Sequence, residues 1–520
     1  MTPHRALRFD DVLREIFPHL LPDVDTVGRQ SLAHSARVCR AFSESALDVL
    51  WQRLRSLAPL MALIPPRAED GRSCADVVQE HVLSQGRSRF QYYARRVRFL
   101  KVPCSYQYSS TDSRGHTIDI VSRLASLCSS VEVLFPSLIS LEWEQSSPHG
   151  NELFAFLSPT LSHLNFWVGS RYRGELEPSA GTQDDSTLEQ LTGALSSVAP
   201  FLRTLRLSGS SPRRPLAFGP AFSQLRALVL NGTTTSTTLS SCAALESLSE
   251  LTIGLLDTDL DALTPCVGFP ALETLAVTGS FSSISHLLCA ISSTSLRSFV
   301  MPDLYPTPES LRDCSGCFAA LGAQFASSLH LIKINCYLEG DGIGENDITA
   351  LGLMDVLNPL LALHLLEDFT IELRGVPLSS SDQDVREMAV AWPRLVNFAL
   401  GYTPGSASPS VYSLSEFARH CPDLVVLHLP RMEIPARPPV EPETQQPSKH
   451  GLQSMLFAGR HDPIREPQVS QLAKFLDYTF PGLRPDCLHA SGWAHVIAAL
   501  GRLRSSRMEV AATSVADDAP

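Results

Sequence analysis

The sequence of 520 residues lacks the local motifs of the common catalytic sites. It contains no Walker A loop, no G-x-S-x-G nucleophile elbow and no H-E-x-x-H zinc-binding pair. Its 16 histidines and many carboxylates form no local constellation that indicates an active site. We therefore expect a protein that binds a partner and is not an enzyme, and we expect no cofactor and no metal.

Positive charge and long apolar runs are also scarce. Only 18% of the residues are charged, which is too few for a largely disordered chain, and the net charge of -12 argues against binding to nucleic acid. The most apolar later window, 350–366, is interrupted by Asp355, Asn358 and Pro359, so no segment is expected to span a membrane. Asp10 and Asp11 interrupt the region where a secretory signal would lie. The 12 scattered cysteines suit free thiols in a reducing compartment, so we expect a cytoplasmic or nuclear protein.

Two weak signals each leave two interpretations open. Cys314, Cys317, His330 and Cys336 have a spacing close to that of a four-ligand zinc site, but they would straddle a whole repeat; the alternative is ordinary thiols on a connecting helix. The run 87–101 interleaves arginines with aromatic residues, which can mark a nucleic-acid site. The acidic character of the rest of the chain favours a helix face that packs its aromatic residues and solvates its charges.

What the sequence does contain is a repeat, L-x-x-L-x-L with apolar replacements. Its copies begin at Leu138, Leu161, Leu202, Leu225, Leu248, Leu272, Leu296, Leu329, Leu366, Leu395 and Leu424, and a degenerate copy begins at Leu452. The five copies from Leu202 to Leu296 are 23 or 24 residues apart, within the range of about 20 to 29 for leucine-rich repeats. The alternating apolar positions predict a short strand in each copy, and several connecting segments have helical periodicity.

These features predict an α/β fold. We expect an irregular horseshoe solenoid of leucine-rich repeats, with parallel strands on the concave face and helices outside. Side chains between the inward leucines would then face a partner. The candidates for binding a target protein on this concave face are Trp167, Arg206, Lys333, Glu372 and His428.

The first sixty residues have a different pattern, that of three short amphipathic helices. Val12, Ile16 and Leu20 recur at helical spacing, and Leu47, Leu50, Trp51 and Leu54 do so again later. So small a unit hides little apolar surface by itself, and we expect part of that surface to be covered by another domain or a partner.

Three runs in this stretch carry a family resemblance: Val12–Phe17, Arg37–Phe42 and Leu47–Trp51. They resemble the F-box of fungal F-box proteins that carry C-terminal leucine-rich repeats. The family usually opens with Leu-Pro, where this chain has Arg8-Phe9. The resemblance implies that the chain binds the Skp adaptor, and through it a cullin, as the substrate adaptor of an SCF-type ubiquitin ligase. The residues expected to contact the Skp adaptor are Val12, Leu13, Ile16, Phe17, Leu32, Val38, Leu50 and Trp51.

Three alternatives remain open. The helices could be an ordinary cap on the solenoid, the chain could be a leucine-rich-repeat scaffold that binds a protein without joining a ligase, or it could be an enzyme with a dispersed active site on the repeats. The expected domains are a helical F-box at 6–60, a helical linker at 61–96, the solenoid at 97–432, a Pro-rich disordered insertion at 433–450, a degenerate last repeat with a C-terminal cap at 451–504, and a flexible tail at 505–520.

Overall fold

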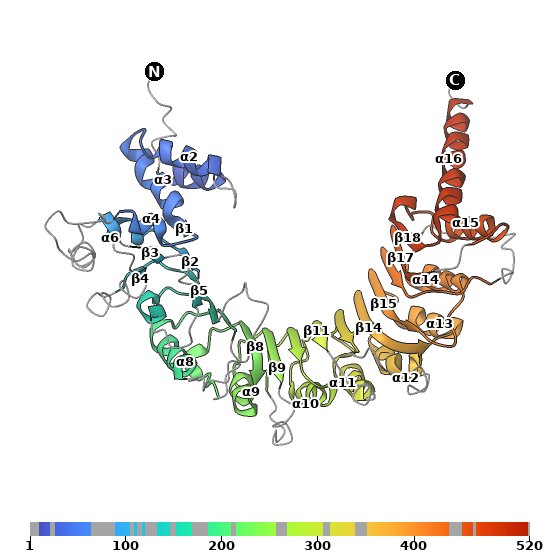
Figure 1. The fold of residues 1–520 in the computed structure, drawn as a ribbon, viewed down its shortest axis with the longest axis horizontal. Coiled ribbons are helices and arrows are strands. Elements are labelled where there is room, and N and C mark those ends of the chain that lie inside the picture. Colours follow the sequence, from blue (N-terminus) through green and yellow to red (C-terminus); the bar gives the residue numbers. More distant parts are fainter. Residues whose placement is uncertain are drawn as a thin grey trace. The chain divides into compact units, whose positions relative to one another are not determined.

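The computed structural model describes residues 10–20, 26–63, 89–103, 109–111, 117–119, 133–145, 152–168, 186–209, 215–255, 268–304, 313–338, 351–435, 450–460 and 464–517. The chain divides into two compact units, Met1–Leu248 and Ser249–Pro520. Each unit is built on parallel strands that follow one another in sequence order (Figure 1).

Unit 1 begins with a helical module, residues 10–52. Its elements are α1 (Asp10–Ile16), the 3-10 helix η2 (Phe17–Leu20), α2 (Thr26–Ser35) and α3 (Arg40–Gln52). The module has a hydrophobic core of its own, formed by Leu13, Phe17, Leu32, Ala46 and Val49.

The first strand of unit 1 follows the helical module without a linker. β1 (Arg53–Leu54) starts where α3 ends, and it pairs in parallel with β2 (Phe99–Val102). The solenoid therefore begins at Arg53, ahead of the start expected at residue 97. The two-residue strand was missed because it is too short to show an alternating pattern. The segment expected as a linker, 61–96, lies mostly outside the described residues, and its last part forms α6 (Arg89–Ala94).

The remaining strands of unit 1 continue the parallel sheet in the order β2-β5-β6-β7-β8. Its other elements are α4 (Ala58–Met61), β3 (Ser109–Thr111), β4 (Thr117–Asp119), β5 (Ser140–Gln145), η4 (Glu152–Phe156), β6 (His163–Val168), α8 (Ser186–Val198), β7 (Thr204–Ser208), η5 (Pro220–Phe222), β8 (Ala227–Thr234) and α9 (Ser236–Ala243). β3 and β4 form a separate antiparallel pair. The strand register brings the fourth position of each repeat into one buried row: Leu100, Leu141, Leu164, Leu205 and Leu228.

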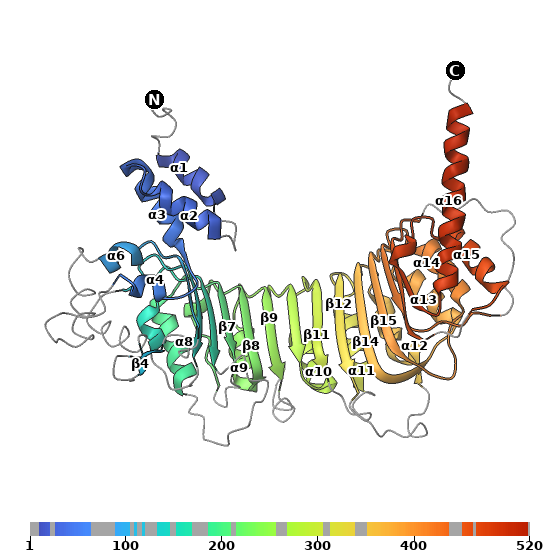
Figure 2. The ribbon, with the colours of Figure 1, turned by 45° about the horizontal axis from the view of Figure 1, so that its top comes forward.

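Unit 2 repeats this arrangement with helices along one side of its sheet (Figure 2). Its strands are β9 (Glu250–Leu255), β10 (Thr274–Thr278), β11 (Ser298–Leu304), β12 (Leu331–Tyr337), β13 (Leu351–Gly352), β14 (Asp368–Ser379), β15 (Asn397–Pro404), β16 (Val426–Leu429), β17 (Ser454–Arg460) and β18 (Leu488–Ser491). Its helices are α10 (Phe281–Ala290), α11 (Cys314–Phe325), α12 (Leu353–Leu357), η8 (Asn358–Ala362), α13 (Asp382–Ala391), η9 (Val411–Ser413), α14 (Leu414–His420), α15 (Gln468–Thr479), η10 (Pro485–Cys487) and α16 (Ala494–Asp517).

The helices of unit 2 form where the sequence caps them and supplies an apolar stripe. Ser381 accepts a hydrogen bond from the backbone N–H of Asp384, and the Asp384 carboxylate accepts one from the N–H of Ser381. The next turns of α13 bury Val385 and Met388 against the sheet side. Because this face is covered by helices, the alternate strand residues form the open face of the sheet.

The C-terminal boundaries differ from those expected. The degenerate copy at Leu452 does form a strand, β17, which pairs with β16, but the following strand β18 was not foreseen. The segment 505–517, expected to be a flexible tail, belongs to α16. Most of the Pro-rich insertion expected at 433–450 lies outside the described residues.

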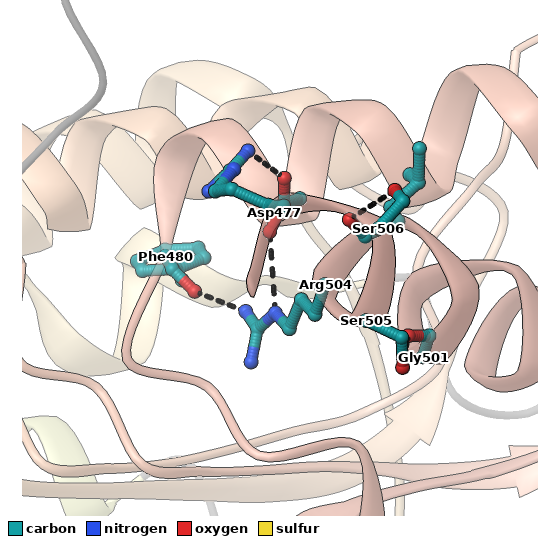
Figure 3. Close-up of polar contacts among 8 residues, drawn as sticks. Asp477, Phe480, Gly501, Arg504, Ser505 and Ser506 are labelled. Carbon is teal, nitrogen blue, oxygen red and sulfur yellow. Dashed lines mark hydrogen bonds and ion pairs between the residues drawn. The ribbon is translucent and has the colours of Figure 1, made fainter. Parts of the chain in front are cut away.

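The α16 helix is held to α15 by one buried carboxylate (Figure 3). The Nε of Arg504 donates to Asp477 Oδ1 at 3.2 Å, and Arg507 pairs with the other oxygen of Asp477. Arg504 also donates from Nη2 to the carbonyl oxygen of Phe480 at 2.9 Å. Because a buried carboxylate is costly without such partners, Asp477 favours the docked position of α16 on α15.

A buried histidine connects α14 to the repeat that follows it. His450 Nδ1 accepts a hydrogen bond from the backbone N–H of Leu452 at 3.1 Å, so its Nε2 carries the proton and donates to the carbonyl oxygen of Cys421 at 2.7 Å. Burial lowers the pKa of His450 below its ordinary value of 6.5, although the hydrogen bond to Cys421 and the charge of Asp423 act in the opposite direction.

His450 should therefore make the stability of unit 2 depend on pH. Below pH 6.5 the unfolded chain takes up a proton at this histidine that the folded chain resists, so this contribution is complete above pH 6.5 and is lost as the pH falls through the lowered folded pKa. Thermal unfolding should show a smaller drop in Tm between neutral and acidic pH for His450→Gln than for the wild type. An equal drop in both proteins would contradict this role.

Candidate binding surface

The open strand face of unit 1 carries two of the predicted target-binding residues on neighbouring strands. Trp167 on β6 is the register partner of Ser208 on β7, and Arg206 on β7 is the register partner of Asn165 on β6. All four side chains project from the face opposite the buried leucines. The structure thus brings Trp167, which is half-buried, and Arg206, which is exposed, onto one patch.

The carboxylates on the same face belong to a different strand and have a cationic partner. Glu142 and Glu144 lie on β5, and Lys101 Nζ on β2 is 3.0 Å from Glu142 Oε2 and 3.6 Å from Glu144 Oε1. The negative charge of β5 is therefore partly compensated inside the sheet face. No such compensation is observed for Arg206 among the described residues.

The other three predicted residues, Lys333, Glu372 and His428, lie on the strand face of unit 2. The β12, β14, β15 and β16 strands that carry or separate them are consecutive in the sheet. Lys333 Nζ is 3.5 Å from Asp368 Oδ2, and Arg374 Nε is 3.6 Å from Glu372 Oε2. Charges on this face are therefore paired along and between strands, and each such surface pair contributes at most about 1 kcal/mol.

The charge of Glu372 acts on His428 across β15. The intervening strand presents Ala399 and Gly401, and a Cβ built on Gly401 would overlap the Glu372 carboxylate. Burial lowers the pKa of His428, the charge of Glu372 acts in the opposite direction, and His489 lowers it further. A glycine at position 401 thus gives the Glu372 carboxylate room to lie over β15, on the side toward His428.

A row of arginines at the start of the strands was missed in the sequence. Arg203 and Arg226 occupy the position directly after the first leucine of two successive repeats, and both are exposed. The backbone N–H of Arg226 donates to the carbonyl oxygen of Arg203 at 2.8 Å, so the two residues are adjacent. The sequence contained a signal for this row, because both arginines occupy the same position in successive repeats. In-register parallel strands place equal positions side by side.

The residues expected to contact the Skp adaptor are divided between the core and the surface of the helical module. The residues that the structure places in the core are Leu13, Phe17 and Leu32, whereas Val12, Leu50 and Trp51 are half-buried. Leu13 and Phe17 belong to the hydrophobic core of the module, so their contact with the Skp adaptor stays a prediction.

The apolar residues left exposed in the helical module are Ile16 at 43%, Val27 at 62% and Val38 at 68%. Ile16 and Val38 were among the expected contacts, and Val27 was missed because it lies in a stretch that reads as a polar connection. Single exposed apolar residues are ordinary, but this module of 43 residues (10–52) has three of the six large ones exposed among the described residues.

The helical module is fixed to the rest of unit 1 by the basic and aromatic run at 87–101. Arg96 is buried and pairs with Glu44 and Asp48 of α3, and it lies over the ring of Tyr92. The Tyr92 hydroxyl donates to Glu44 Oε1 at 2.6 Å.

These contacts also shift the titration of the side chains at this junction. Burial and the hydrogen bond to Glu44 raise the pKa of Tyr92 to about 12. Nearby, Trp51 stacks on Tyr93 with ring centroids 4.3 Å apart. The described part of the run therefore packs against α3, as the helix-face interpretation predicts; Arg87 lies outside the described residues.

The cysteines of the weak zinc signal lie in the core. Cys314 and Cys317 are buried on α11, Cys336 is buried on β12, and burial raises the pKa of each of the three thiols to about 12. His330 instead approaches Glu367, with Nδ1 3.1 Å from Oε1. In the described part of the chain, no group of three or more His, Cys, Asp or Glu side chains is arranged to hold a metal ion.

No model of a known protein family matches the sequence, and no curated protein matches it. Among solved structures, the chain is similar to a leucine-rich-repeat protein of Leptospira interrogans, with 13% sequence identity and a TM-score of 0.31, over 76% of this chain and 84% of that one. We assign the fold from the strand register and the buried rows of leucines, and not from this similarity. The fold is a leucine-rich-repeat solenoid. None of its described helices is both long enough and apolar enough to cross a membrane.

Proposed function

We propose that this protein is the substrate-recognition adaptor of an SCF-type cullin-RING ubiquitin ligase. In this proposal the helical module binds the Skp adaptor and the strand face of the solenoid holds a target protein. The observation that carries the proposal is the exposure of Ile16, Val27 and Val38 on a module that has a complete core of its own. Its sequence resemblance to the F-box gives this surface a specific partner.

The contribution of such an adaptor to ubiquitin transfer is proximity. Holding a target lysine near the charged ubiquitin carrier makes the transfer effectively intramolecular and needs no catalytic group from this chain. The direct passage from α3 into β1 supports this role, because a linker-free connection limits the positions that the strand face of unit 1 can take relative to the helices. The buried Arg96 with its two carboxylate partners stiffens the same connection.

Co-purification of the full chain with the Skp adaptor tests the proposal. We expect the wild type to bind, and we expect the double variant Ile16→Asp/Val38→Asp to lose at least about tenfold in affinity, because two charges would be desolvated against an apolar partner. Both residues are exposed, so the variant should keep its fold. The matched control is Val390→Asp on α13 in unit 2, where the valine is 52% exposed, and it should bind like the wild type.

Three results would count against the proposal. Failure of the folded wild type to bind the Skp adaptor at micromolar concentration would favour a scaffold that binds a protein partner outside any ligase. Equal binding by the double variant would remove the exposed apolar residues from the interface. An equal loss in Val390→Asp would show that the measured binding is nonspecific.

A further inference from the structure

The strand face of unit 1 carries an arginine cluster although the chain as a whole has a net charge of -12. The cluster consists of Arg203, Arg206 and Arg226, all of which are exposed on or next to the neighbouring strands β7 and β8. Arg203 and Arg226 are adjacent through a backbone hydrogen bond of 2.8 Å. Arg206 lies three residues after Arg203, on β7 and on the patch that includes Trp167.

Two arginines of the cluster, Arg203 and Arg206, form no ion pair within the described part of unit 1. In register, Arg206 is flanked by Asn165 and Val229, which are uncharged. The nearest strand with carboxylates in this row is β5, two strands away, and its Glu142 and Glu144 already have Lys101 as a partner.

The strand face of unit 2 provides the contrast. There two cationic strand residues have acidic partners, Asp368 for Lys333 and Glu372 for Arg374. A charged group without a partner on a binding surface attracts the opposite charge, and complementary charge sets both the encounter rate and the choice of partner. The arginine cluster therefore indicates an anionic ligand for unit 1.

The groups around the arginines suit a peptide. Phe201, in the turn that precedes Arg203, is 63% exposed, and Trp167 lies beside Ser208 on the same face. Asn231 donates from Nδ2 to Ser208 Oγ at 2.9 Å, which leaves the Asn231 carbonyl oxygen as an acceptor for a backbone N–H. Aromatic and arginine side chains together are typical of sites where proteins bind peptides.

We propose that the β6–β8 face of unit 1 binds a protein segment rich in aspartate and glutamate, with Arg203 and Arg206 pairing to its carboxylates. The proposal deepens the proposed function and rests on it, because it names the chemistry of the target that the adaptor would recruit. Arg203 and Arg206 lie three residues apart along the chain, which spans about 10 Å in extended backbone. That spread matches several carboxylates along an extended segment better than it matches a single phosphate, which needs donors that converge on one point.

Fluorescence polarisation with the purified full chain tests this proposal without any ligase component. The probe is a fluorescein-labelled peptide of alternating glutamate and serine. A second peptide has glutamine at every glutamate position, and a third is the glutamine peptide with one phosphoserine. We expect binding only of the glutamate peptide, and weakening of that binding when NaCl rises from about 0.05 M to about 0.5 M.

The double charge reversal Arg203→Glu/Arg206→Glu should weaken binding of the glutamate peptide at least about tenfold, because two attractive contacts become repulsive. The matched control is Arg297→Glu/Arg394→Glu in unit 2. It makes the same change in net charge at two exposed arginines, and Arg297 occupies the repeat position that corresponds to Arg203. Binding by the control should match that of the wild type.

Equal binding of the glutamate and glutamine peptides would overturn the proposal, as would an equal loss in both double variants. Binding of the phosphoserine peptide alone would show that the cluster reads a phosphate and not a run of carboxylates. The Skp adaptor is absent from this assay, so the two proposals can fail separately. Binding of the glutamate peptide without co-purification of the Skp adaptor would contradict only the ligase assignment. Co-purification of the Skp adaptor without binding of the glutamate peptide would contradict only the acidic-segment proposal.

Discussion

Replacing Phe17 with alanine is expected to unfold the helical module while the repeats stay folded. Phe17 is only 4% exposed, and its ring meets that of Phe42 edge-on with centroids 5.5 Å apart. Removing a buried phenylalanine costs about 3–5 kcal/mol, because the cavity it leaves is only partly filled. A core of five buried side chains provides little more free energy than that.

Hydrogen exchange of the full chain measures this result segment by segment. Amides in residues 10–52 should lose protection in Phe17→Ala, and those in unit 2 should keep it. Ile16→Ala is the matched control, because it removes an exposed apolar side chain from the preceding position and should leave protection unchanged. If Phe17→Ala kept full protection of the module but lost the Skp adaptor, Phe17 would belong to the partner surface after all.

The difference between Phe17 and Ile16 marks the limit of what the sequence predicts in this module. Periodicity places both residues on a broad apolar stripe, but which edge of the stripe is covered depends on the tertiary packing of α2 and α3. That packing is fixed by contacts between residues far apart in the sequence, such as Phe17 with Phe42. A single helical pattern therefore predicts that a face is apolar, and it cannot tell the core from a docking surface.

The solenoid was predictable for a different reason. Each L-x-x-L-x-L copy specifies the same local structure. A copy with a weak pattern can therefore still be assigned from the spacing of the copies on either side of it. Two of the strands that were missed, β1 and β18, lie outside this pattern: Arg53–Leu54 is two residues long, and Leu488–Ser491 follows no recognisable repeat leucine. The alternation within each copy also predicted which residues face away from the core, including Trp167 and Arg206.

The charge environment of the candidate surface was not predictable from the copies one at a time. Lys333 and Arg206 occupy the same position of their repeats, and the sequence gives no reason to separate them. Their difference arises across the strands, because Lys333 has Asp368 on the neighbouring strand and Arg206 has Asn165 and Val229. The number of residues between neighbouring strands varies, so this pairing requires the observed register.

The second large effect is expected from Trp392→Ala in unit 2. Trp392 is fully buried at the end of α13 and stacks on Phe369 of β14 with ring centroids 4.5 Å apart. Its Nε1 donates to the carbonyl oxygen of Leu360 at 3.1 Å. The side chain thus packs the end of α13 onto the strand of its own repeat, and its hydrogen bond joins this repeat to the preceding one. We expect a loss of about 3–5 kcal/mol from the cavity and a further cost of about 1–3 kcal/mol from the unpaired carbonyl.

Trp392→Phe separates these two contributions. The smaller ring keeps most of the contact with Phe369 and removes the donor, so denaturant unfolding should show a loss of about 1–3 kcal/mol for this variant. Because each repeat of a solenoid contacts only its neighbours, hydrogen exchange in Trp392→Ala should rise first around β14 and β15 and leave the helical module protected. A uniform rise in exchange through unit 2 would mean that its repeats unfold as one cooperative block. It would contradict the prediction that Trp392 stabilises mainly the repeats next to it.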